Sequence, residues 1–151
     1  MDGRPVQLDV SLLAHQLPVF RWRRARHTVY PKGRRAGGTD GAVRTCLRWG
    51  YRSPTGRPLR QLWVDSTHRN ITRYINRYFL RSLRKLPVDK AYWLNRGEMT
   101  LKFSTGGIVD FGSVEQGHKL EGWAYDVVWI NEAGHVLKDE DFYWQTIVPM
   151  T

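Results

Sequence analysis

The chain has one cysteine, no internal repeat and no long apolar run. Because Cys46 stands alone, an intramolecular disulfide and a metal site built only from cysteines are excluded. No apolar run approaches the roughly 20 residues that a membrane-spanning helix needs, and the N-terminus lacks the apolar core of a signal peptide. These absences predict one domain of 151 residues that has no membrane partner and works in a reducing compartment.

Acidic residues are scarce in the first part of the chain, and basic residues are scarce in the second. Residues 1–86 hold 19 of the 24 Lys and Arg but only 4 of the 14 Asp and Glu, whereas residues 87–151 hold 5 and 10. A basic surface attracts polyanions, above all nucleic acid. The pattern predicts one-sided binding to nucleic acid, with adventitious binding by a basic protein as the alternative.

Apolar periodicity predicts short helices at 12–24 and 39–49 and strands at 27–30 and 59–64. The clearest helix covers 68–85, after N-cap chemistry at 65–67. Its apolar residues recur every three or four positions and form one stripe. They are Ile71, Tyr74, Ile75, Tyr78, Phe79 and Leu83.

Three further strands are predicted in the second half. The segments 98–103 and 108–111 alternate in polarity and flank a hairpin turn, and 125–130 is an apolar run typical of a strand buried on both faces. Acidic residues at 139–141 are expected to cap a helix at 142–148, with a two-metal nuclease centre as the alternative. Strands that alternate with helices predict an α/β fold of three layers, with a largely parallel central sheet flanked by helices.

Glycines give segment 32–39, Lys-Gly-Arg-Arg-Ala-Gly-Gly-Thr, the composition of a phosphate-binding loop. Gly33 and Gly37 would let backbone N–H groups approach phosphate oxygens, and the following helix would add the positive charge of its N-terminus. Thr39 stands where a hydroxyl group coordinates Mg²⁺, but the lysine expected just before it is replaced by Gly38. A basic surface turn is the alternative.

The apolar strand at 125–130 is followed by Asn131 and Glu132. A Mg-ATP site needs an acidic pair in this position, the first residue to hold the metal and the second to polarise the attacking water. Asn131 can orient a metal-bound water through its carbonyl oxygen, although it brings no charge, and Glu132 is the remaining carboxylate. A core strand with polar residues at its exposed end is the alternative.

Four stretches of the chain resemble the ATPase half of the large terminase subunit of tailed bacteriophages. They are the glutamine segment 14–20, the phosphate loop 32–39, the residues 111–113 and 119–123 that precede the metal-binding strand, and that strand itself, 127–133. The resemblance implies a P-loop NTPase fold. Residues 1–151 would be the core portion of the ATPase domain, incomplete at the C-terminus and without the nuclease domain.

The resemblance also accounts for the displaced lysine. Some terminases have a loop of the pattern Lys-x-x-Arg-x-Gly-x-Ser/Thr, which this chain matches position by position with Lys32, Arg35, Gly37 and Thr39. A long, flexible lysine side chain can reach a phosphate from either end of a short loop. The phosphate-binding residues implied are Lys32, Gly33, Arg34, Arg35, Gly37, Gly38 and Thr39.

By the same resemblance, Gln16 would read the adenine edge, Thr39 and Asn131 would position Mg²⁺, and Glu132 would activate water for attack on ATP. Asn131 departs from the aspartate usual in the family. The implied function is ATP-driven packaging of double-stranded DNA in the host cytoplasm, by a homo-oligomeric ring on a capsid portal with a small terminase subunit as partner.

Two other functions stay open. A non-catalytic nucleic-acid-binding or assembly module would keep the fold and lose the chemistry, as Gly38 and Asn131 suggest. A helicase-like ATPase of the same superfamily is disfavoured, because Ala133 and Gly134 follow Glu132 in place of the x-His/Asp of a helicase motif.

Arginines recur every four residues on the predicted helix 68–85, at Arg69, Arg73, Arg77 and Arg81, on the face opposite its apolar stripe. None has an acidic partner four residues away, and each like-charged pair costs roughly 0.2–0.5 kcal/mol. We therefore expect an external anionic partner, either DNA phosphates or an acidic surface of a neighbouring subunit. A merely solvated face is the alternative.

Overall fold

The computed structural model describes residues 37–84, 86, 90–120 and 122–150, together with Leu12, Gln16, Phe20 and Thr28. The side chains of residues 118 and 119 are not described. The helix predicted at 12–24 and the strand predicted at 27–30 therefore lie almost entirely outside the described residues. No described helix is both long and apolar enough to cross a membrane.

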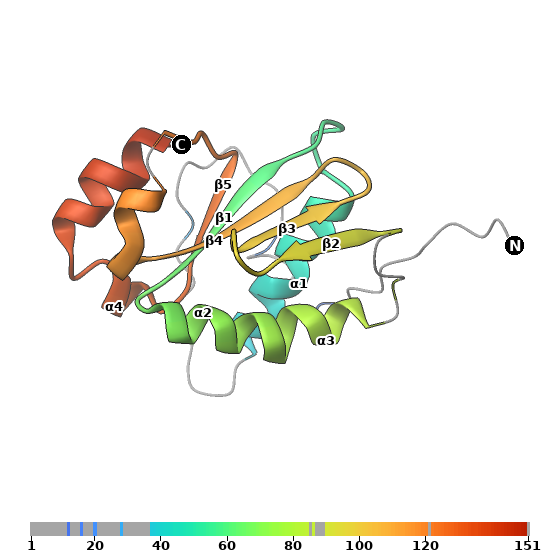
Figure 1. Cartoon of the computed structure of the whole chain (residues 1–151), viewed down its shortest axis with the longest axis horizontal. Coiled ribbons are helices and arrows are strands. Elements are labelled where there is room, and N and C mark those ends of the chain that lie inside the picture. The colour runs from blue at the N-terminus through green and yellow to red at the C-terminus, as the bar shows by residue number, and fades with distance from the viewer. Residues whose placement is uncertain are drawn as a thin grey trace, which may run out of the picture.

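A five-stranded sheet forms the centre of the protein (Figure 1), in the order β2-β3-β4-β1-β5. The strands are β1 (Arg60–Asp65), β2 (Tyr92–Asn95), β3 (Thr100–Phe103), β4 (Ile108–Ser113) and β5 (Val127–Ile130). β1 runs parallel to both β4 and β5, whereas β2 and β3 join the sheet as antiparallel strands. The predicted α/β fold with a parallel centre is confirmed.

The helices predicted at 39–49, 68–85 and 142–148 are present close to those bounds, whereas two short helices, η2 (Val114–Lys119) and α4 (Ala133–Val136), were not predicted. The other described helices are α1 (Gly38–Tyr51), the continuous run α2 (His68–Tyr74), η1 (Ile75–Phe79) and α3 (Leu80–Leu83), then η3 (Phe142–Ile147) and η4 (Val148–Met150). The Thr67 hydroxyl caps α2 by accepting a hydrogen bond from Asn70 N at 3.2 Å, as the sequence predicts. The π-helical turn η1 interrupts the α-helix and was not predicted.

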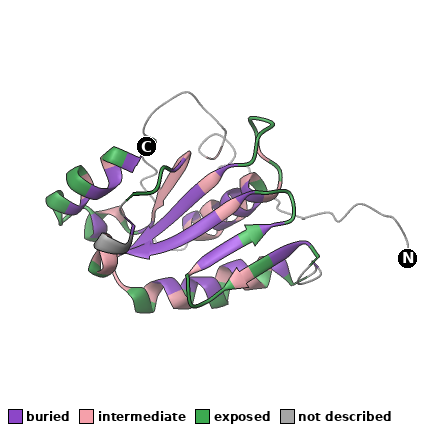
Figure 2. Ribbon diagram, turned by 45° about the horizontal axis from the view of Figure 1, so that its top comes forward, coloured by how far each residue is buried: buried purple, intermediate pink, exposed green. Residues whose placement is uncertain are grey.

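Two apolar clusters lie on opposite faces of the sheet. Helices α1 and α2–α3 cover one face, where the predicted stripe residues Ile71, Ile75 and Phe79 pack with Trp63 of β1. The C-terminal helices cover the other face, where their residues pack on Leu62 and Val64, which alternate with Trp63 along β1. Both faces of β1 are therefore buried, and Figure 2 shows buried residues concentrated along the central strands.

Two strand predictions were wrong in detail. The strand predicted at 98–103 begins only at Thr100, because Asn95 Oδ1 accepts hydrogen bonds from Gly97 N and Glu98 N at 3.0 Å and forms a turn there. The strand before this turn, β2, was missed. β5 is also not buried on both faces: it pairs with β1 alone among the described strands, and each of its residues is half-buried.

Candidate functional site

Polar side chains line the carboxyl ends of the three parallel strands. Ser113 at the end of β4 pairs in register with Asp65 at the end of β1, and the ladder continues to Asn131, whose N–H donates to Val64 O at 3.0 Å. All three polar residues are buried. Ligands of open α/β sheets bind at this edge of the sheet.

Helix α1 begins at the same edge. Its N-cap is Gly37, which has φ 69° and ψ 15°, in the left-handed region that glycine adopts without steric cost. The N–H groups of the first turn of a helix have no partner within the helix and carry partial positive charge. With 14 residues, α1 is long enough to offer an anion this positive end, at the position that the sequence predicts for phosphate binding.

Gln16 lies against the start of α1, although the two are far apart in sequence. Its Nε2 donates a hydrogen bond to Gly37 O at 2.9 Å, and its side chain is buried. The close approach depends on Gly41, since a Cβ there would lie 2.7 Å from the Phe20 ring and 3.0 Å from the Gln16 side-chain amide. The structure thus joins Gln16 to the loop, and its role in reading adenine stays a prediction.

Thr39 and Asn131 meet, although 92 positions separate them. Thr39 Oγ1 donates a hydrogen bond to Asn131 Oδ1 at 3.3 Å. Thr39 is half-buried in the first turn of α1, and Asn131 is buried immediately after β5. The fold therefore brings together the two residues that the sequence nominates for the metal, one from each of its two candidate elements.

Asp65 is a buried residue of this site that the sequence analysis missed. Its side chain has no solvent exposure, and its Oδ2 accepts a hydrogen bond from Asn131 Nδ2 at 2.8 Å. In the sequence, Asp65 precedes Ser66 and Thr67 and was interpreted as part of a helix cap. The signal that identifies it is long-range: Asp65 ends the strand that pairs with the one ending at Asn131.

Glu132 has a strained backbone. With φ 53° and ψ 50° it occupies the left-handed region, where a residue with a Cβ pays roughly 1–2 kcal/mol. Such strain clusters at functional sites, because the surrounding structure must hold it in place. The turn begins helix α4, with His135 N donating to Glu132 O at 2.8 Å, and leaves Glu132 exposed beside the buried Asn131.

The donor atoms at this edge suit magnesium. Mg²⁺ prefers oxygen ligands and keeps several of its waters, so one or two protein oxygens and the substrate phosphates suffice. Thr39 offers a hydroxyl oxygen and Asn131 an amide oxygen, and the Asp65 carboxylate behind them supplies negative charge. The residues present therefore fit the metal that the resemblance implies.

Lys32, Gly33, Arg34 and Arg35 lie outside the described residues, and their roles stay predictions. Gly38 is buried as the first residue of α1.

The four arginines of the α2–α3 helix are exposed along one side of the molecule, as predicted. Arg73 donates to Asn70 Oδ1 at 2.9 Å and lies over the Tyr74 ring. Within the described part of the chain, no acidic residue pairs with Arg69, Arg77 or Arg81. Their positive charge therefore faces solvent.

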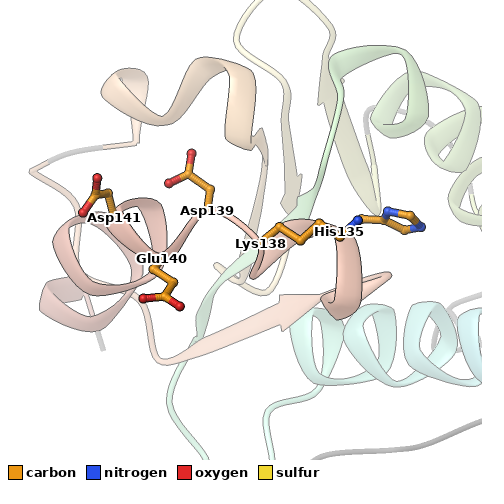
Figure 3. A pocket seen from close by; sticks show the side chains of 5 residues that line it. All are labelled: His135, Lys138, Asp139, Glu140 and Asp141. Carbon is orange, nitrogen blue, oxygen red and sulfur yellow. The ribbon is translucent and has the colours of Figure 1, made fainter.

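A shallow hollow of about 670 Å³ lies between α4 and η3, lined by five residues (Figure 3): His135, Lys138, Asp139, Glu140 and Asp141. Asp139 Oδ1 accepts a hydrogen bond from Phe142 N at 2.9 Å, which confirms the predicted capping. The described residues contain no group of three or more potential metal ligands of the His, Cys, Asp and Glu types. The hollow therefore gives no support to a two-metal nuclease centre.

Comparison with known proteins gives one similar fold. The large terminase ATPase domain of Thermus phage P74-26 superposes with a TM-score of 0.67 at 16% sequence identity, over 97% of this chain and 60% of that chain. At this identity the likeness shows the fold alone, and the chain spans about 60% of the length of that domain structure. No protein-family model matches the sequence, and no curated protein matches it.

Proposed function

We propose that the chain binds Mg-ATP at the carboxyl edge of its sheet and hydrolyses it, as the core of the ATPase domain of a DNA-packaging motor. The observation that carries the proposal is the 3.3 Å hydrogen bond from Thr39 to Asn131. It joins the start of the loop helix to the end of β5, which is the arrangement a phosphate-bound metal requires. The similarity of the fold to a phage terminase ATPase domain supports the same function.

In this proposal, residues at the start of α1 bind the nucleotide. The N–H groups of the first turn and the Lys32 ammonium bind the phosphates, with Arg34 and Arg35 in the same loop. Gln16 reads adenine from its position beside Gly37. Bound Mg²⁺ would neutralise phosphate charge, and Thr39 and Asn131 are the residues that would hold it.

Glu132 acts as the general base. Its carboxylate accepts a proton from a water whose oxygen attacks the γ-phosphorus, the bond from that phosphorus to the bridging oxygen breaks, and ADP leaves. The exposed position of Glu132 at the end of β5 suits this role. Glu132 is exposed in the strained turn that follows the strand, whereas its neighbour Asn131 is buried.

The exposed arginines of α2–α3 are proposed to contact DNA. Four residues of α-helix advance about 6 Å, comparable to the spacing of phosphates along one DNA strand. A ring of subunits around double-stranded DNA, seated on a capsid portal and served by a small terminase subunit, is the assembly that this function implies. The same arginines would serve a non-catalytic DNA-binding module, which is the second candidate function.

The test of hydrolysis is Glu132→Gln. Removing the general base should lower the rate of ATP hydrolysis by about two to four orders of magnitude and leave ATP affinity within about twofold. Glu140→Gln removes an exposed carboxylate of the same charge elsewhere and should keep full activity. A wild-type chain that binds duplex DNA but shows neither ATP binding nor hydrolysis would favour the non-catalytic module.

The lysine assignment has its own control within the loop. Lys32→Ala should weaken ATP binding more than Arg34→Ala does, because only Lys32 occupies the lysine position of the variant loop. Equal effects of the two substitutions on the dissociation constant would remove the reason for assigning Lys32.

The test of DNA contact is the triple variant R69Q/R77Q/R81Q. Each lost phosphate contact should reduce the slope of log affinity against log salt by about one, so the triple variant should lose about three. R52Q/K102Q/K138Q removes the same charge from exposed positions elsewhere and serves as the control. If both variants lose the same amount of slope, the loss is explained by net charge and not by contacts of these arginines with DNA.

A further inference from the structure

We propose that Asp65 is a positioning residue of the nucleotide site, which holds the Asn131 amide with its oxygen toward the metal and supplies the negative charge that Asn131 lacks. This inference rests on the proposed function, since it concerns the same site. Asp65 would contact neither ATP nor the metal. It would act through Asn131.

The direction of the Asn131 amide follows from its two neighbours. The Asp65 carboxylate can only accept hydrogen bonds when ionised, so the amide group facing it at 2.8 Å must be Nδ2, the donor. The amide oxygen then points the other way, where it accepts the hydrogen bond from Thr39 at 3.3 Å. Asp65 thereby decides which end of Asn131 the metal site receives.

The two carboxylate oxygens of Asp65 have different surroundings. Oδ1 accepts hydrogen bonds from Ser66 N at 2.7 Å, Asn70 Nδ2 at 2.8 Å and Ser66 Oγ at 3.1 Å, which fix the side chain to the start of α2. Among the described residues, Oδ2 accepts from Asn131 alone. One oxygen anchors the carboxylate, and the other faces the candidate site.

Helix capping does not explain the second oxygen. Thr67 already caps α2 through Asn70 N, and the contacts of Asp65 Oδ1 reinforce that turn. A cap needs no contact with Asn131, which lies on another strand. The Oδ2 contact instead resembles the hydrogen bonds by which outer residues orient metal ligands and raise their basicity.

Charge at this position is conveyed through the amide. A carboxylate that accepts from an amide N–H polarises the group and increases the negative charge on its oxygen, an effect that a dry interior strengthens. Asp65 has no solvent exposure. The pair would therefore serve as a charged ligand divided over two strands, with the carboxylate on β1 and the ligating oxygen just after β5.

Asp65→Asn tests the orientation directly. The Oδ1 side can keep its acceptor contacts with Ser66 and Asn70, but an amide nitrogen then faces the Asn131 nitrogen. To avoid the unpaired donors, Asn131 should turn over and present its NH₂ group to the metal side. The expected result is a loss of Mg²⁺ dependence in nucleotide binding rather than a loss of folding.

The measurement is the ATP dissociation constant by calorimetry, with Mg²⁺ and with EDTA, in chains that all carry Glu132→Gln so that ATP is not consumed. Loss of an outer partner typically costs 10–100-fold in metal affinity. The ratio of the two dissociation constants should accordingly fall by about tenfold or more in D65N. Affinity in EDTA should change by less than about threefold.

Two further variants keep the inference falsifiable. The double variant D65N/N131D exchanges the two groups, restores one carboxylate beside one amide, and should recover the Mg²⁺ effect. Ser66→Ala removes one donor to Oδ1 and leaves Asn131 untouched, so it should retain the wild-type ratio. Thermal unfolding in EDTA checks that each variant folds.

The outcomes separate this inference from the proposed function. If the parent chain shows no ATP binding at all, the proposed function fails, and the metal-side role of Asp65 fails with it. If the parent chain binds Mg-ATP but D65N keeps the full Mg²⁺ effect, only the role of Asp65 is overturned. Failure of the double variant to recover the effect would likewise overturn it, as would equal losses in D65N and S66A.

Discussion

Strand β1 begins with a charged residue, Arg60, and ends with another, Asp65, but the surroundings of the two charges differ. At the first end, Arg60 Nη2 lies 2.8 Å from Asp110 Oδ2, and its guanidinium carbon lies 3.7 Å from the centre of the Trp123 ring. The backbone N–H of Arg60 donates to Asp126 Oδ2 at 2.9 Å. Arg60 and Asp110 therefore pair with each other, and Asp126 pairs with Arg57, so each of these charges has a partner of opposite sign.

At the other end, the Asp65 carboxylate is buried among neutral donors. Among the described residues, Ser66, Asn70 and Asn131 supply its hydrogen bonds, and no cation pairs with it. A buried charge without a counter-ion is costly, so proteins retain it where a ligand or metal uses it. The ion pairs at the Arg60 end therefore stabilise the folded protein, whereas the buried carboxylate at the Asp65 end is suited to binding a ligand or metal.

The largest effect on stability is expected for Arg60→Met. It keeps an apolar stem against Trp123 but leaves Asp110 without its cation, so the free energy of unfolding should fall by about 2 kcal/mol, since both partners are only partly exposed. Urea unfolding measures the change. ATP affinity should stay within about twofold, and a larger loss would mean that the two ends of β1 are not independent.

The second test uses pH. Burial, the larger cause, and the nearby Asp110 carboxylate raise the pKa of Tyr125 well above its ordinary value of about 10. The folded state favours the neutral phenol of Tyr125. The resulting contribution to the free energy of unfolding is fully present below about pH 10 and is lost as pH rises through the pKa of the folded state.

Tyr125→Phe should remove this dependence. Between pH 7 and pH 11, wild-type stability relative to Y125F should fall by about 1 kcal/mol, because the unfolded tyrosine ionises first. Urea unfolding of both chains at the two pH values gives the difference. A constant difference would show that Tyr125 is no more protected than an exposed phenol.

The smallest effect is expected for Arg57→Ala. Arg57 pairs with Asp126 at the same end of β1, but its side chain is 66% exposed, so water and salt screen the pair. The expected loss is about 0.5 kcal/mol or less at low salt. Thermal unfolding at low and high salt measures it, and a loss comparable to that of Arg60→Met would contradict the distinction between rim and buried pairs.

Much of the fold could be predicted because its signals are local. The stripe of the α2–α3 helix, the Thr67 cap and the turn between β3 and β4 each depend on residues within a few positions of one another. The partial burial of β5, which pairs with β1 alone among the described strands, could not be predicted in this way. An apolar run indicates that a strand is hydrophobic, whereas the burial of that strand depends on how many strands and helices lie beside it.

The candidate site likewise contains residues that local motifs predict and one that only a long-range contact identifies. Sequence motifs predict Thr39, Asn131 and Gln16 as site residues, and the fold brings each of them to the start of α1. Asp65 was not nominated, because Asp-Ser-Thr before a helix has a sufficient local explanation. Its contact with Asn131 spans 66 positions and exists only because β1 pairs with β5.

Sequence patterns alone identify the chemical groups available to this protein: a glycine loop before a helix, an Asn-Glu pair after an apolar strand, and a face of four arginines. Composition and periodicity are sufficient for that, since they concern neighbours along the chain. Which of these groups share a site depends on the three-dimensional fold, which also brings the buried Asp65 carboxylate next to Asn131. Strand pairing causes this, because parallel order aligns strand ends that lie far apart in sequence.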